Sequence, residues 1–184
     1  MDPQIFHSIF DNDRVVNSMI KVSESEDDLG FLLRLHLISE AYLEALISSA
    51  MRKIDLFSEE SKDGIYLKLG FPAKATLALK LGMPLAAYKA FSAINSHRNK
   101  AAHQLNREVL DSELINKIYN LVDSIGSYEK DDLTKHGALF YNDDGSLRKK
   151  YIFSENETPD RIKLLILISA LYARVGVEIG VLRK

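Results

Sequence analysis

Apolar residues recur every three or four positions along most of this chain, which is the spacing of α-helices that bury one face. The pattern predicts a short first helix over 9–22 and a long helix over 29–54. Apolar side chains cover so much of the long helix that we expect it to pack against several partners. The other predicted helices, with a connection over 55–70 before them, run over 71–82, from about 84 to 103, from 111 to about 125 and from 158 to about 182.

Several residues suit the predicted helix ends. Pro72 and Pro159 would stand in the first turns of their helices, and Thr158 would be the N-cap of the last one. Gly82 is a plausible helix stop. The acidic run 23–28 is interpreted as a loop and a solvated helix start, where carboxylates favour the helix dipole, rather than as a metal site.

One segment breaks the helical pattern. Residues 138–141 and 147–153 flank the turn sequence Asn-Asp-Asp-Gly-Ser, which predicts a small β-hairpin. Its second arm contains Arg148-Lys149-Lys150, the densest basic cluster of the chain. Protection of an edge strand by lysines explains this cluster better than a nucleic-acid contact, which is the alternative. The whole pattern predicts one all-α bundle of about six helices with a hairpin excursion.

Composition limits the possible classes of function. Of the 184 residues 46% are hydrophobic and 27% charged, which suits a single globular domain over 1–184. The net charge of −2 does not favour nucleic acid or anionic membranes, except through a local patch. The lack of cysteine excludes disulfides, thiolate catalysis and Cys-ligated zinc. No signal peptide is recognisable and the apolar run 164–172 is too short to span a bilayer, so we expect a cytoplasmic protein without a membrane segment.

The segment 95–103, Asn-Ser-His-Arg-Asn-Lys-Ala-Ala-His, holds more unexplained polar chemistry than any other. No glycine-rich phosphate loop, HExxH zinc motif or GxSxG elbow occurs elsewhere, and we expect no metal or cofactor. Arg98 falls inside an apolar stripe that continues at Leu105. A guanidinium on the core-facing side of a helix must be paired or must face a wet cleft, because burying it alone is costly.

Helical geometry divides the polar residues of this segment. Ser92, Asn95, Asn99 and His103 would line a strip beside Arg98. Arg98 and His103 lie about 140° apart on an ideal helix. They could therefore serve one site only if the helix frays near His103 or if a second chain completes the site.

The long helix contains two carboxylates that need partners. Glu40 and Glu44 form an i, i+4 pair, with His36 one turn earlier. They could be a polar stripe that faces solvent, or one of them could pair with Arg98. Since the helix has no lysine or arginine between Arg34 and Arg52, the pairing with Arg98 is a reasonable hypothesis.

An arginine and a histidine together suit the cleavage of RNA by its own 2′-hydroxyl. This reaction needs a base for the hydroxyl proton, an acid for the leaving oxygen and positive charge beside the crowded phosphate. Histidine can be the acid or the base, and the arginine fork suits the phosphate. One histidine cannot readily do both tasks, so a two-fold dimer would bring two sets to one cleft. From spacing alone, a helix-end histidine beside a structural arginine is the plainer interpretation.

A family resemblance adds to this picture. The sequence 98–103, Arg-Asn-Lys-Ala-Ala-His, resembles the signature of the HEPN superfamily, in which an arginine and a polar residue precede a histidine in an all-α domain. The segment 37–44 is similar to the long early helix of such domains. The segments 71–82 and 95–103 together resemble the mannitol operon repressor (MtlR-like) group in particular. The resemblance covers about residues 29–125.

The resemblance implies a function and an alternative. Many HEPN proteins are metal-independent endoribonucleases, often toxins or antiviral effectors, that act as dimers. It implies Arg98 and His103 as catalytic residues, Asn99 as a phosphate contact, and Glu40 and Asn95 as supporting residues, Glu40 by holding Arg98. We therefore expect a homodimer that cleaves RNA and is controlled by an antitoxin or a regulatory protein. The alternative is a non-enzymatic regulatory module like the MtlR group, which binds proteins; a DNA-binding repressor fits the negative net charge less well.

Overall fold

The computed structural model describes the chain except for residues 12, 24, 26, 62, 104–109, 127–130, 143 and 183–184. Within the described ranges the chain forms seven α-helices, one 3-10 turn and one two-stranded sheet. These elements are α1 (Pro3–Phe10), α2 (Asp13–Ser23), α3 (Asp28–Met51), α4 (Phe71–Lys80), α5 (Leu85–His103), α6 (Ser112–Asp123), η1 (Leu133–Lys135), β1 (Gly137–Tyr141), β2 (Leu147–Ile152) and α7 (Asp160–Glu178). The predicted mostly helical fold with a small hairpin is confirmed.

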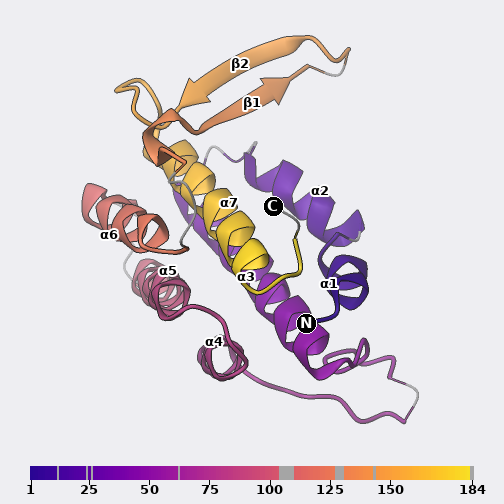
Figure 1. Ribbon diagram of the computed structural model, residues 1–184. Helices are drawn as coiled ribbons and strands as arrows, with labels where there is room; N and C mark the ends of the chain where they lie inside the picture. Colours follow the sequence, from indigo (N-terminus) through magenta and orange to yellow (C-terminus); the bar gives the residue numbers. More distant parts are fainter. Residues whose placement is uncertain are drawn as a thin grey trace.

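Helices α3 and α7 cross the middle of the molecule, with α5 and α6 on one side and α1 and α2 on the other (Figure 1). Helix α3 contacts α1, α2, α4, α5 and α7, as its wide apolar coverage predicts. It begins at Asp27, whose carboxylate accepts hydrogen bonds from the backbone N–H groups of Leu29 and Gly30. The helix ends at Arg52, which adopts a left-handed conformation with φ of 54°.

Aromatic rings join α3 to α7 in the core. The Tyr42 ring stacks on the Tyr172 ring with centroids 4.4 Å apart, and its hydroxyl donates a 2.8 Å hydrogen bond to the Tyr172 carbonyl. The Ser39 and Tyr172 hydroxyls lie 2.8 Å apart. Burial raises the pKa of both tyrosines. Each of these buried polar groups has a partner, as a low-dielectric interior requires.

The prediction of a single first helix over 9–22 is wrong. The chain begins with α1, capped by the Asp2 carboxylate, which accepts from the N–H groups of Gln4 and Ile5. Helix α2 then follows as a separate element, and both helices pack on α3. The break between them lets Phe6 and Val22, on different helices, both reach the core.

The predicted start of the last helix needs a smaller correction. Pro159, not Thr158, is the N-cap residue of α7. Thr158 is buried, and its hydroxyl donates a 2.6 Å hydrogen bond to the carbonyl of Ile152, at the end of β2. Helix α7 ends at Glu178, a few residues before the predicted end near Leu182. Gly180 follows with φ of 76°, a conformation that ends helices and favours glycine.

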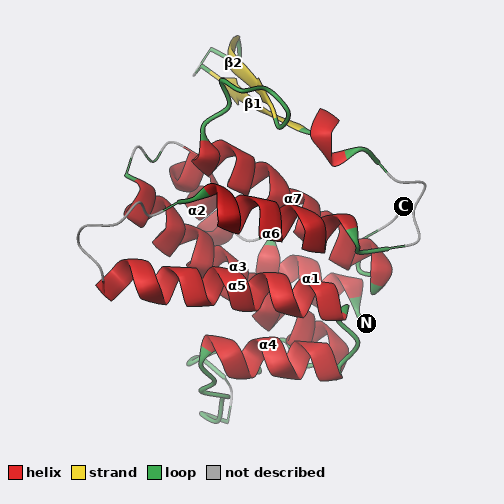
Figure 2. Cartoon of the chain, turned by 90° about the vertical axis from the view of Figure 1, so that its left-hand side faces the viewer, coloured by secondary structure: helices red, strands yellow, loops and turns green. Residues whose placement is uncertain are grey.

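The predicted hairpin is confirmed, and it stands off one end of the helical bundle, with α4 at the other end (Figure 2). Strands β1 and β2 pair antiparallel, from Gly137 opposite Ile152 to Tyr141 opposite Leu147, with an irregularity after Phe140. Asp143 of the predicted turn lies outside the described residues. None of the described helices combines the length and the apolar composition that a membrane crossing needs.

Candidate functional site

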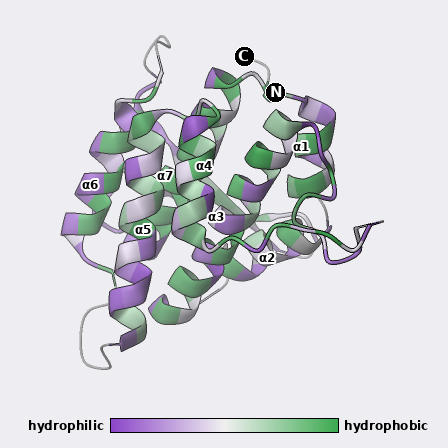
Figure 3. Cartoon of the chain, turned by 90° about the horizontal axis from the view of Figure 1, so that it is seen from below, coloured by the Kyte–Doolittle hydropathy of each residue, from purple (hydrophilic) through white to green (hydrophobic). Residues whose placement is uncertain are grey.

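Helix α5 changes character along its length. Its first half is apolar and buried, with Ala87, Ala90, Phe91 and Ile94 packed in the core. The second half, from Asn95 to the end of the helix, is polar, and Figure 3 shows this end as hydrophilic. The core contacts of the first half fix the helix, and the polar second half is therefore held in a set orientation.

Arg98 lies half-buried on this second half of α5. Its Nη1 donates a 2.9 Å hydrogen bond to the side-chain oxygen of Asn99. Its Nε is buried and has no hydrogen-bond partner among the residues that the structure describes. Leaving a buried donor unpaired costs about 1–3 kcal/mol, so this guanidinium has capacity for an acceptor that the described part of the chain does not supply.

The predicted pairing of Arg98 with a glutamate of α3 is wrong. Glu40 and Glu44 both accept hydrogen bonds from Lys74 of α4, with Nζ to oxygen distances of 2.6 and 2.5 Å. The Lys74 side chain is 8% exposed, and its Nζ also lies 5.4 Å from the centroid of the Phe57 ring. Although burial disfavours the charged form, the hydrogen bonds and charges of the two glutamates raise the pKa of Lys74.

The sequence analysis did not identify Lys74, which stands in the apolar stripe of α4. Its neighbours at helical spacing, Phe71, Ala75 and Ala78, are all buried. A lysine inside such a stripe is the signal that could have identified it, by the same argument that singled out Arg98. Both residues are cations on core-facing helix sides, yet of the two only Lys74 is paired with carboxylates of the described ranges.

Asn95 is turned into the bundle. Its side-chain oxygen lies 3.0 Å from Nε2 of His36, whose ring stacks on Phe71 with centroids 4.3 Å apart. Burial lowers the pKa of His36; the Asn95 hydrogen bond and Glu40 oppose this shift, and the charges of Arg98 and Lys74 add to it. Asn95 therefore joins α5 to α3 and lies beside Arg98, in keeping with a supporting position.

His103 stands apart from Arg98 within one chain. It is an exposed residue in the last turn of α5, and no hydrogen bond to Arg98 is found among the residues that the structure describes. Asn99, one helical turn before it, is exposed too. The predicted strip of polar residues is thus divided, because Asn95 faces the bundle while Asn99 and His103 face solvent. Leu105, the expected continuation of the stripe, lies outside the described residues.

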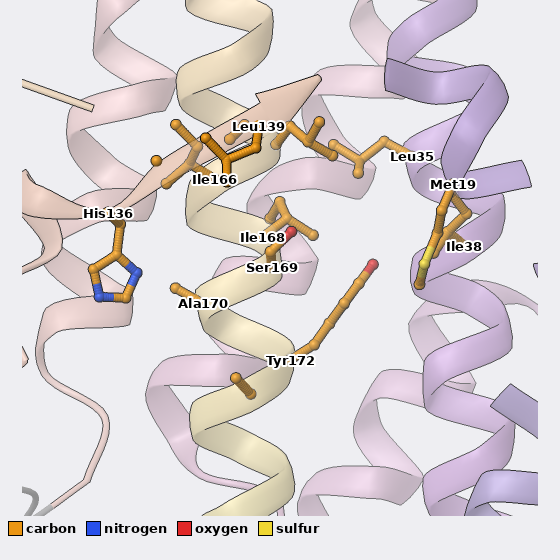
Figure 4. A pocket seen from close by; sticks show the side chains of 14 residues that line it. Met19, Leu35, Ile38, His136, Leu139, Ile166, Ile168, Ser169, Ala170 and Tyr172 are labelled. Atoms are coloured by element: carbon orange, nitrogen blue, oxygen red, sulfur yellow. The ribbon is translucent and has the colours of Figure 1, made fainter. Parts of the chain in front are cut away.

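A pocket of about 480 Å³ lies elsewhere, between α2, α3, β1 and α7 (Figure 4). Its walls are mostly apolar, with Leu35, Ile38 and Ile166 among them, and its polar groups include His136 and Ser169. No residue of α5 contributes to it. The pocket is therefore separate from the polar end of α5. Among the described side chains, no three histidines, aspartates or glutamates lie close enough to hold a metal ion.

The candidate site is thus a half-buried guanidinium with an unfilled donor, next to an exposed amide, on a helix that ends in an exposed histidine. Such a group can bind one oxyanion, and a phosphate matches the arginine fork. The resemblance to HEPN proteins stays a prediction from the sequence motif. Comparisons of this chain with models of protein families, with curated proteins and with solved structures find no match.

Proposed function

We propose that this protein is a metal-independent endoribonuclease of the HEPN type, acting in the cytoplasm as a toxin or defence effector. The observation that supports this best is the buried Nε of Arg98, which has no partner among the described residues, in a guanidinium that no described carboxylate neutralises. A structural arginine at this depth would be expected to have its donors occupied, as Lys74 has. An anion from outside the chain would fill the vacant donor position.

The reaction follows from the residue types. One histidine takes the proton from the 2′-hydroxyl, and the 2′-oxygen forms a new bond to phosphorus. The bond from phosphorus to the 5′-oxygen breaks, and a second histidine gives that oxygen its proton. Arg98 stabilises the negative charge of the crowded phosphate, and Asn99, which already binds Arg98, orients it. The products are a 2′,3′-cyclic phosphate and a free 5′-hydroxyl.

Two copies of the chain supply the two histidines. His103 is exposed and is not bonded to Arg98 of its own chain, so a second copy has access to it. A two-fold axis beside the polar end of α5 would place both His103 side chains and both guanidiniums around one phosphodiester. A dimer is therefore part of the proposal.

The test is RNA cleavage by purified protein in the presence of a chelator, for wild type and His103→Ala. We expect the wild type to release fragments with 2′,3′-cyclic ends and the variant to lose cleavage by about 10²-fold or more. His7→Ala is the matched control, because His7 is also a partly exposed helical histidine and lies on α1, away from α5. Equal cleavage by wild type and His103→Ala would contradict the proposal. RNA that stays intact with both proteins would contradict it too.

The second candidate is a non-enzymatic regulatory module like the MtlR group, which binds a partner protein. The separation of Arg98 and His103 within one chain favours it, because a monomer would then lack a complete site. Sedimentation distinguishes the two, since the nuclease must be dimeric. Toxicity on expression that Arg98→Ala relieves would support the nuclease, and harmless expression of wild type would support the module.

A further inference from the structure

The hairpin has two different faces. Side chains opposite each other on paired strands share a face, and successive residues alternate between faces. The first part of β1, from Gly137 to Leu139, lines the apolar pocket above α7, and the Leu139 side chain shares one face of the hairpin with its pair Lys150 (Figure 4). Phe140, the next residue, pairs with Lys149, and Ala138 pairs with Tyr151, so these residues lie on the opposite face. This outer face is not part of the bundle core.

Aromatic rings and cations alternate on the outer face. The rings of Phe140 and Tyr151 meet edge to face with centroids 5.6 Å apart, and both residues are only partly buried. The Lys149 ammonium lies 4.6 Å from the centre of the Tyr151 ring, and the Arg148 guanidinium lies 5.9 Å from that of Phe140. Lys150 is exposed too, but it pairs with Leu139 and so lies on the other face. Each ring therefore has a cation within cation–π distance.

The charge of this ribbon contrasts with that of the whole chain. The chain has a net charge of −2, yet three consecutive cations stand on β2. In the described part of the hairpin the one acidic residue is Asp144, in the turn. Its carboxylate accepts hydrogen bonds from the N–H and the hydroxyl of Ser146, so it is occupied within the turn. The local field at β2 is positive and suits a polyanion.

We propose that the outer face of the hairpin is a binding platform for single-stranded RNA. Phosphates contact Arg148 and Lys149, and unpaired bases stack on Phe140 and Tyr151. The inference rests on the proposed nuclease function, for which the hairpin would hold the substrate. Protection of the strand edge, the simpler explanation of the lysines, requires charge alone and gives no reason for two partly exposed rings between the cations.

The test is binding of a labelled single-stranded RNA of about 12 nucleotides, measured by anisotropy between about 50 and 200 mM salt. The protein carries His103→Ala throughout, so that the probe stays intact. The first variant has Arg148→Gln and Lys149→Gln. The matched control has Lys80→Gln and Lys117→Gln, two exposed helical lysines, and removes the same charge. Phe140→Leu with Tyr151→Leu keeps the apolar contact of the ribbon but removes the stacking rings.

We expect the hairpin charge variant to bind at least about tenfold more weakly and to lower the salt slope by about 1.4, since each phosphate contact to a single strand contributes about 0.7. The leucine variant should bind about fivefold or more weakly. The control should bind like its parent, and all variants should keep the parent's thermal midpoint. An equal loss of RNA binding in the control variant would contradict the proposal. So would a preference for duplex RNA or anionic vesicles over the single strand.

The two proposals can fail separately. If the wild type does not cleave RNA but the hairpin variants lose binding, the nuclease fails and the platform stands. If cleavage depends on His103 but neither RNA binding nor cleavage responds to the hairpin variants, the platform fails and the nuclease stands.

Discussion

Lys74 and Arg98 are two cations on core-facing sides of neighbouring helices, and their surroundings are opposite. Lys74 of α4 is bound by Glu40 and Glu44 at 2.6 and 2.5 Å, and its side chain is 8% exposed. Within the described part of the chain, Arg98 of α5 donates a hydrogen bond to Asn99, and its buried Nε has no partner. Both cations act on His36, whose pKa they lower together with burial. Among the described residues, carboxylates neutralise Lys74 but not Arg98.

The difference is what our proposal builds on: Lys74 belongs to an ion cluster with its own carboxylates, and Arg98 is proposed to bind an anion. Removing a buried charge from a satisfied cluster leaves its partners uncompensated, and the fold becomes less stable. Removing a cation that has no carboxylate partner leaves few groups unpaired. The main effect is then a lower affinity for the anion that the cation binds. Substitution of Lys74 should therefore lower mainly the stability of the fold, and substitution of Arg98 should weaken mainly the binding of an anion.

The largest expected effect is the loss of RNA cleavage in Arg98→Ala, by about 10²- to 10³-fold, because the phosphate charge in the transition state loses its partner. The free energy of unfolding should change by less than about 1 kcal/mol, since one exposed hydrogen bond is lost. Cleavage kinetics and urea unfolding measure the two quantities. Arg34→Ala, an exposed arginine of α3, is the control and should change neither. A stability loss of several kcal/mol would place Arg98 with Lys74 as a structural residue.

The second effect is on stability. Lys74→Met should lower the free energy of unfolding by about 2–3 kcal/mol, because it leaves two carboxylates side by side. The loss falls below the usual range for buried pairs because the glutamates are 26% and 29% exposed and can turn toward solvent. Adding Glu40→Gln and Glu44→Gln to this variant should recover most of the loss. The exposed Lys80→Met on the same helix should have almost no effect, and a similar loss there would contradict the comparison.

A third effect appears only on acidification. The folded protein lowers the pKa of His36 from 6.5, so the unfolded state binds the proton first as the pH falls. The stability from neutral His36 is complete above pH 6.5 and is lost as the pH falls through the folded pKa. Unfolding of wild type and His36→Gln at pH 7.5 and 5.5 tests this. The wild type should lose more stability between the two, and equal losses would show that His36 is not the titrating group.

The smallest effect is expected for Glu40→Gln, and it bears directly on the predicted pairing with Arg98. Lys74 keeps Glu44, so the free energy of unfolding should fall by less than about 1 kcal/mol. Cleavage should stay within about twofold of wild type, because Glu40 does not hold Arg98. A drop in cleavage as large as that of Arg98→Ala would indicate that Glu40 does pair with Arg98 when the substrate is bound.

Much of the fold could be read from local patterns. The long helix, the helix that begins at Phe71, the polar end of α5 and the presence of the hairpin all follow from spacing, prolines and turn residues. The register of the hairpin, with its irregularity after Phe140, was not predicted. The first helix could not, because the apolar spacing over 9–22 continues through a break that only packing against α3 imposes. Asp2-Pro3, a cap followed by a proline, was the local signal for the true start.

The chain's own residues determined which groups carry chemistry: a guanidinium and an imidazole on one polar helix end, and a cluster of cations on one strand. Tertiary structure alone decided their partners. Lys74 lies 34 and 30 residues from Glu40 and Glu44, so no local pattern could assign it to them. The way α4 packs on α3 brings Lys74 to the carboxylates and leaves Arg98 without them. The physical reason is that helical periodicity fixes the face on which a side chain lies, whereas its partner depends on which other face the packed bundle brings against it.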